Sequence, residues 1–171
     1  SSDVCSSDLA NMGERISHLV MVGTAYPMKV SEALLATARE TPLKAIDMVN
    51  ALSISSLAAK PSNPGPGTWL HGVSRALMRR LQAGYAQAGH GNLFHHDFSI
   101  CDRYTGAMEA ASQVSCPVLM VLGGKDSMTS PKAAAPLAAA LRAEMLTLPS
   151  GHSLMGEAPD AVLNALKGTA P

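Results

Sequence analysis

The chain has 171 residues, of which 47% are hydrophobic and 15% charged, a composition that fits a globular protein and excludes a disordered one. Its 13 basic residues are balanced by 13 acidic ones, which argues against a face that binds nucleic acid. No apolar run reaches the roughly 18 residues that a membrane-spanning helix requires.

The first nine residues, SSDVCSSDL, match the translation of a common sequencing adapter in one reading frame. We therefore expect residues 1–9 to be foreign to the natural protein, and we leave them out of the fold prediction. The natural sequence is then expected to begin near Ala10, inside a longer reading frame. On this interpretation the chain is a C-terminal fragment.

Three short apolar runs predict β-strands, at residues 16–23, 117–123 and 144–148. The first two runs are apolar at successive positions instead of alternating positions. This pattern is typical of strands that are covered on both faces in a parallel sheet.

Residues 28–113 contain helical patterns and no strong strand. Thr41 and Pro42 form a typical helix start, because proline fits the first helical position. An all-helical insertion between two parallel strands predicts a cap over the sheet. We therefore divide the natural sequence into a core strand at 10–27, a helical cap at 28–113 and a second core region at 114–171. The helical patterns cover residues 31–39, 42–52, 70–82 and about 98–111.

The second core region predicts the order strand, helix, strand, helix. Ser130 can cap a helix that starts at Pro131. A last helix is expected from Pro159 to a stop near Gly168. This order forms a right-handed βαβ unit with a covering helix. The predicted fold class is α/β, with about three parallel strands, flanking helices and a mainly helical cap.

Two residues with catalytic chemistry follow strands at the same predicted edge of the sheet. Asp126 comes after the 117–123 strand, and His152 comes after the 144–148 strand. Ligands of open α/β sheets bind beyond the carboxyl ends of the strands. We expect a hydrogen bond between the two side chains, because a carboxylate that accepts from one imidazole nitrogen leaves the other nitrogen free to take a proton.

The sequence around this pair resembles the C-terminal part of the α/β-hydrolase family. The resemblance spans about residues 13–167 and rests on ISHLVMVGTAYP, CPVLMVLGGKD and SPKAAAPLAAALRAEMLTLPSGHSLMGEAPDAV. It implies a triad in the chain order nucleophile, acid, histidine, with Asp126 as the acid and His152 as the base. It also implies a nucleophile in a G-x-S-x-G turn upstream of Gly13.

No G-x-S-x-G turn occurs in the sequence, although two serines come near the pattern. Ser153 follows a strand, but Met155 occupies the fifth position, which must be small, and Pro159 delays the next helix. Ser74 lies in the sequence GVSRA of the predicted cap. We expect neither serine to be the nucleophile.

The resemblance implies an esterase-like enzyme for acyl-transfer hydrolysis of a small substrate, and the leucine and methionine residues of the predicted cap indicate that this substrate is mainly apolar. Met128 and Leu154 are weaker candidates for residues that line its site. The fragment alone is expected to be inactive, because the nucleophile and the oxyanion hole would lie upstream. A haloperoxidase-type relative with the same triad, a dehalogenase or epoxide hydrolase with an aspartate nucleophile, and a non-catalytic binding protein of the same shape stay open as alternatives.

We expect neither a cofactor nor a metal site. His95 and His96 are adjacent, and adjacent residues of a helix do not face one another, so they lack the spacing of metal ligands. The expected ligand is a small molecule, with no nucleic acid and no membrane span, and the default expectation for location is the cytoplasm.

Overall fold

The structure, a computed structural model, describes residues 15–55 and 69–169. The prediction for residues 1–9 therefore lies outside the described residues. The elements in chain order are β1 (Leu19–Val22), α2 (Glu32–Glu40), α3 (Pro42–Ser53), α4 (Leu70–Gln87), α5 (Leu93–Arg103), α6 (Ala107–Gln113), β2 (Val118–Gly123), α7 (Pro131–Leu141), β3 (Glu144–Leu148), α8 (Leu154–Glu157) and α9 (Pro159–Gly168).

The three predicted strands are present and form one parallel sheet in the order β1-β2-β3. Leu19 pairs with Val118 at the start of β1, and Leu119 pairs with Glu144 at the start of β3. The carboxyl ends of all three strands therefore lie at the same edge of the sheet. Within the described part of the chain, β1 is hydrogen-bonded to β2 alone, so its other edge is open.

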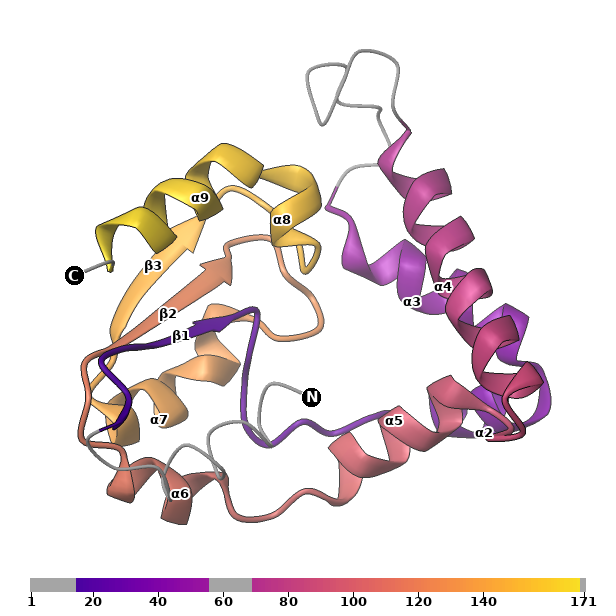
Figure 1. Cartoon of the computed structure of the whole chain (residues 1–171), viewed down its shortest axis with the longest axis horizontal. Helices are drawn as coiled ribbons and strands as arrows, with labels where there is room; N and C mark the ends of the chain where they lie inside the picture. Colours follow the sequence, from indigo (N-terminus) through magenta and orange to yellow (C-terminus); the bar gives the residue numbers. More distant parts are fainter. Residues whose placement is uncertain (1–14, 56–68, 170–171) are drawn as a thin grey trace.

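Helices cover both faces of the sheet (Figure 1). Met120 and Leu122 of β2 point to the face covered by α6 and α7, where they join the largest apolar cluster. The intervening Val121 points to the opposite face and packs with Val162 of α9. This two-residue alternation, with both faces apolar, explains why the sequence of β2 is apolar without interruption.

Local capping explains where several helices begin. The hydroxyl of Ser31 accepts a hydrogen bond from the backbone N–H of Leu34 and starts α2. The hydroxyl of Ser130 accepts from the N–H of Ala133, and Pro131 takes the first helical position of α7. The two predicted helix starts, at Thr41–Pro42 and at Ser130–Pro131, are confirmed, because α3 begins at Pro42 and α7 at Pro131.

The predicted helix at about 98–111 is wrong in its extent, because two helices occupy this region. The side chain of Asn92 accepts a hydrogen bond from the N–H of His95 and starts α5 five residues earlier than the prediction. The chain then leaves the helical conformation at Tyr104, and α6 begins after Gly106. The asparagine cap and the glycine break were not weighed in the prediction.

Helices α2 to α5 form a separate layer beside the sheet, visible on the right of Figure 1. Their shared apolar cluster is built around Leu34, Ala38, Ala45 and Val49. Helix α6 falls within the expected cap range of 28–113, but its alanines pack in the cluster beneath the sheet. None of the described helices is both long enough and apolar enough to cross a bilayer.

Candidate active site

The loops after β2 and β3 are joined by backbone hydrogen bonds. The N–H of Gly124 donates to the carbonyl of Leu148 at 2.8 Å, and the N–H of Lys125 donates to that of Ser150 at 2.9 Å. The loop after β3 also passes directly over Gly123, where an added Cβ would lie 2.2 Å from the carbonyl oxygen of Gly151. Only glycine at position 123 allows this approach.

Asp126 lies at the end of the turn after β2, and its carboxylate is fully buried, with 0% of the side chain exposed. One oxygen, Oδ1, accepts hydrogen bonds from the backbone N–H groups of Met128 and Thr129, at 2.7 and 2.9 Å. The other, Oδ2, lies 2.9 Å from Nδ1 of His152. The hydrogen bond predicted between Asp126 and His152 is therefore present.

These contacts keep Asp126 ionised. Burial on its own would raise the pKa of the carboxyl, but the hydrogen bonds from His152 and Thr129 outweigh it and lower the pKa from 3.8 to about 2. An ionised Asp126 can only accept, so the imidazole Nδ1 carries the proton in this hydrogen bond.

The imidazole of His152 is held at one nitrogen and open at the other. Its side chain is 31% exposed, and its Nδ1 faces Asp126. Among the described residues, Nε2 has no hydrogen-bond partner. The ring therefore has the tautomer and the accessible Nε2 lone pair that a general base requires.

Thr129 is a member of the site that the sequence analysis missed. Its hydroxyl oxygen lies 2.8 Å from the Asp126 Oδ2, 3.0 Å from the His152 Nδ1 and 2.8 Å from the backbone carbonyl of Gly23 at the end of β1. One hydroxyl thus connects the ends of all three strands. Its position three residues after Asp126 is a signal that could have been read, because threonine at that spacing can bond an aspartate in the turn.

The loop before His152 is anchored by Glu157, which is 6% exposed. The Glu157 carboxylate accepts hydrogen bonds from the N–H of Gly151 at 3.1 Å and from the N–H of Ser55 at 2.9 Å, and it also accepts from the Ser55 hydroxyl. The N–H of Ser153 donates to the carbonyl of Ser53 at 2.8 Å. The chain leaving α3 is therefore attached to both sides of His152.

The two weaker candidates occupy different environments. Met128 is partly buried against the apolar cluster of α2 and α3, and its sulfur lies 3.5 Å from the Ser53 hydroxyl. Leu154 is 1% exposed and packs with Val121 beneath α9. A role of Met128 or Leu154 in lining a substrate site stays a prediction.

The two serines set aside as nucleophiles have other positions. Ser153 precedes the short helix α8, and Ser74 lies inside α4, far from any turn between a strand and a helix.

The three parallel strands, the Asp–His pair at their carboxyl ends and the helices between β1 and β2 correspond to part of the α/β-hydrolase fold. Solved structures confirm that the chain has this partial fold. An esterase from Exiguobacterium antarcticum matches with a TM-score of 0.75 at 14% identity, over 98% of this chain and 62% of its own. An enol-lactonase from Burkholderia xenovorans matches with a TM-score of 0.71 at 18% identity, over 98% of this chain and 61% of its own.

A bromoperoxidase from Bacillus anthracis matches with a TM-score of 0.72 at 13% identity, over 96% of this chain and 62% of its own. At sequence identities of 13% to 18%, these matches show a similarity of fold alone. The chain spans less than two thirds of the length of these proteins. No model of a known family and no curated protein matches the sequence.

Proposed function

We propose that Asp126 and His152 are the acid and the base of a nucleophile–acid–histidine triad that hydrolyses small, mainly apolar esters. The observation that carries this proposal is the hydrogen bond of 2.9 Å between a fully buried carboxylate and a half-buried imidazole. Both side chains stand at the carboxyl ends of adjacent parallel strands, where α/β sheets bind their ligands.

In the proposed reaction, Nε2 of His152 takes the proton from the nucleophile as the nucleophile bonds to the ester carbonyl carbon. The imidazolium then donates this proton to the leaving alcohol oxygen as the carbon–oxygen bond breaks. Water attacks the acyl intermediate with the same help from His152 and releases the acid. Asp126 stays ionised throughout, because its pKa of about 2 lies far below neutral pH, and it stabilises the imidazolium.

The nucleophile of this proposal comes from a part of the fold that these residues do not contain. The sequence has no G-x-S-x-G turn. The open edge of β1 is where a further parallel strand would pair, with its carboxyl end beside those of β1 and β2. The chain of 171 residues by itself is therefore proposed to be inactive toward esters.

The test is an assay of p-nitrophenyl acetate hydrolysis by the longer protein that includes the upstream reading frame. His152→Ala and Asp126→Asn should each lower kcat by about 10³–10⁴-fold, as in the Ser-His-Asp triads. His90→Ala is the matched control, because His90 lies beyond the end of α4 and away from the pair. Near-normal turnover in either site variant would refute the proposal.

A serine-directed fluorophosphonate separates the possible nucleophiles. Covalent labelling of the longer protein, lost in His152→Ala, would identify a serine that His152 activates. An active enzyme that resists this reagent would instead carry a nucleophile other than serine, such as an aspartate. A protein that is neither labelled nor active would be a binding protein with the shape of a hydrolase.

A further inference from the structure

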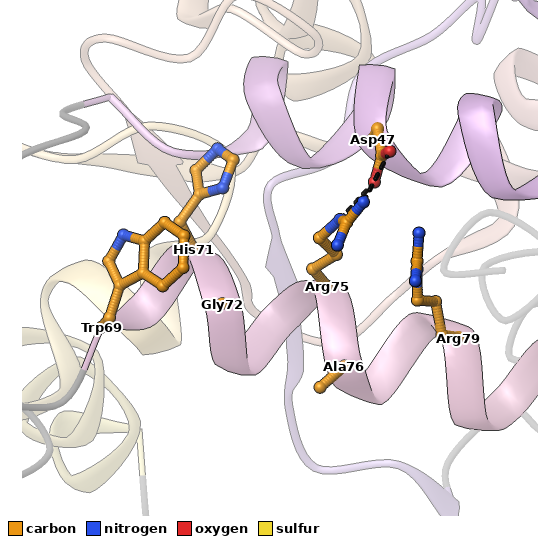
Figure 2. Close-up of a pocket in the computed structure, with 7 residues that line it drawn as sticks. All are labelled: Asp47, Trp69, His71, Gly72, Arg75, Ala76 and Arg79. Atoms are coloured by element: carbon orange, nitrogen blue, oxygen red, sulfur yellow. Dashed lines mark hydrogen bonds and ion pairs between the residues drawn. The ribbon is translucent and has the colours of Figure 1, made fainter.

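The cap contains a pocket whose lining includes neither Asp126 nor His152. It lies along one side of α4, facing α3, and has a volume of about 540 Å³. Pockets of roughly 300–1,000 Å³ are typical of small-molecule sites. The side chains that line it are shown in Figure 2: Asp47, Trp69, His71, Gly72, Arg75, Ala76 and Arg79.

Helical spacing places three nitrogen-bearing side chains in a row along this pocket. His71, Arg75 and Arg79 follow one another at intervals of four residues on α4, so they share one side of the helix. Figure 2 shows the two guanidinium groups extending from α4 toward α3. One wall of the pocket therefore carries two guanidinium groups and an imidazole.

Among the described residues, the lining contains one carboxylate, and it is already paired. Asp47 of α3 accepts two hydrogen bonds from Arg75, one from Nε and one from Nη2, the latter at 2.9 Å. The hydrogen bonds from Arg75 lower the pKa of Asp47, and the nearby charge of Arg79 acts in the same direction. Asp47 is therefore ionised and neutralises one of the two arginines.

The contacts with Asn50 indicate which ring nitrogen of His71 carries the proton. The amide Nδ2 of Asn50 lies 2.8 Å from the carbonyl oxygen of His71, a contact that only an N–H group can make. The same Nδ2 lies 2.9 Å from His71 Nδ1, so Nδ1 is the acceptor and the proton of the uncharged ring is on Nε2. That Nε2–H has no acceptor among the described residues.

Arg79 is the charged group without a counterion. Among the described residues it forms no hydrogen bond and no ion pair, and its Nε is buried without a partner. With Asp47 paired to Arg75, the two arginines and the one carboxylate of the lining leave one positive charge, on Arg79, without a counterion. The guanidinium of Arg79 is a donor with a positive charge, so a ligand bound at Arg79 must supply an acceptor and a negative charge.

The other end of the pocket is apolar. The indole of Trp69 is 57% exposed and stacks on the ring of His71, with centroids 5.9 Å apart. It also lies on Gly72, where an added Cβ would be 2.5 Å from the indole Cε3. Gly72 and Arg79 are seven residues apart, so the two ends of the pocket are separated by about 10 Å. Between these two ends, Gly72 and Ala76 form the pocket wall and add no polar side chain.

We propose that this pocket binds an elongated monocarboxylate, with its carboxylate on Arg79 and its apolar chain along Ala76 and Gly72 to Trp69. An acyl chain of about eight carbons spans the roughly 10 Å between the two ends. The site is independent of the proposed ester hydrolysis, because it shares no residue with the Asp–His pair.

The test is a fluorescence titration of the 171-residue chain with octanoate. Trp69 is the only tryptophan in the sequence, so the emission reports on the pocket alone. Octanoate should give a saturable change in the tryptophan emission. The alcohol 1-octanol has the same chain without the charge. It should bind at least about tenfold more weakly, because a hydrogen bond to a charged group contributes about 1.5–3 kcal/mol. Inorganic phosphate tests whether an anion without an apolar chain is enough.

Arg79→Met should weaken octanoate binding by about tenfold or more, whereas Arg80→Met, which removes an exposed arginine outside the pocket, should leave it unchanged. Circular dichroism checks that both variants keep their helices. Equal affinities for octanoate and octanol, equal affinities in the two variants, or no saturable change would overturn the proposal. If Arg79→Met unfolds, the comparison of octanoate with octanol on the unaltered chain tests the proposal by itself.

Discussion

Glu157 and Gly151 are joined by a hydrogen bond of 3.1 Å from the backbone N–H of Gly151 to the Glu157 carboxylate. Because Gly151 directly precedes His152, this bond sets the position of the loop that carries the imidazole. The same carboxylate accepts from Ser55, two residues beyond the end of α3, so one buried side chain connects the cap to the histidine loop.

Replacement of Glu157 by alanine should lower the free energy of unfolding by about 2–4 kcal/mol, because it leaves the buried N–H of Gly151 and the partly buried N–H of Ser55 without an acceptor. Urea unfolding of the variant checks this. Glu109→Ala, which removes an exposed glutamate of α6, is the control and should change stability by less than about 0.5 kcal/mol. Equal stabilities of the two variants would contradict the anchoring role of Glu157.

The low pKa of Asp126 predicts a pH dependence of stability. The pKa of this carboxyl is about 2 in the folded chain, below its usual 3.8, so the folded state favours the ionised form. The resulting stabilisation, about 2 kcal/mol, is fully present above pH 4 and is lost as the pH falls from about 4 to about 2.

The difference in unfolding free energy between the unaltered chain and Asp126→Asn should therefore shrink as the pH is lowered through this range. Urea unfolding at pH 5, 4 and 3 measures it. Asp97→Asn, at an exposed position of α5, should follow the unaltered chain at each pH. A difference for Asp126→Asn that is constant with pH would show that the aspartate is not stabilised in its ionised form.

Thr129→Val keeps the size of the side chain and removes the hydroxyl that contacts Asp126, His152 and Gly23. We expect a loss of about 1–2 kcal/mol in unfolding free energy and a higher pKa of Asp126, because the ionised carboxylate loses a donor. NMR titration of the Asp126 carboxyl carbon measures the pKa. Thr147→Val, on the exposed side of β3, should leave that pKa unchanged.

Two glycine-to-alanine substitutions should have opposite effects. At Gly123 the new methyl group would lie 2.2 Å from the carbonyl oxygen of Gly151, and backbone at a strand end cannot move away cheaply, so we expect a loss of about 3 kcal/mol or more. At Gly84, inside α4, nothing lies within 4 Å of the new group. Alanine there should raise stability by about 0.5–1 kcal/mol, and thermal unfolding compares the two variants.

Much of the fold follows from short-range signals. Continuous apolar runs predicted the strands, and Ser130 with Pro131 predicted the start of α7, because caps and side-chain periodicity act within a few residues. The meeting of Asp126 and His152 could also be predicted, since both follow strands whose carboxyl ends must share one edge in a parallel sheet.

The sequence alone therefore determined the fold class, the positions of the strands in the chain and the two residues at the centre of the candidate site. Only the tertiary structure decided that Thr129 joins them, that Glu157 anchors their loop to Ser55, and that Arg79 remains unpaired beside Trp69. Contacts such as the one from Ser55 to Glu157 join residues 102 positions apart in the chain. No local pattern encodes such a contact, because it forms only when packing brings separate elements into van der Waals contact and leaves a buried polar atom to be satisfied.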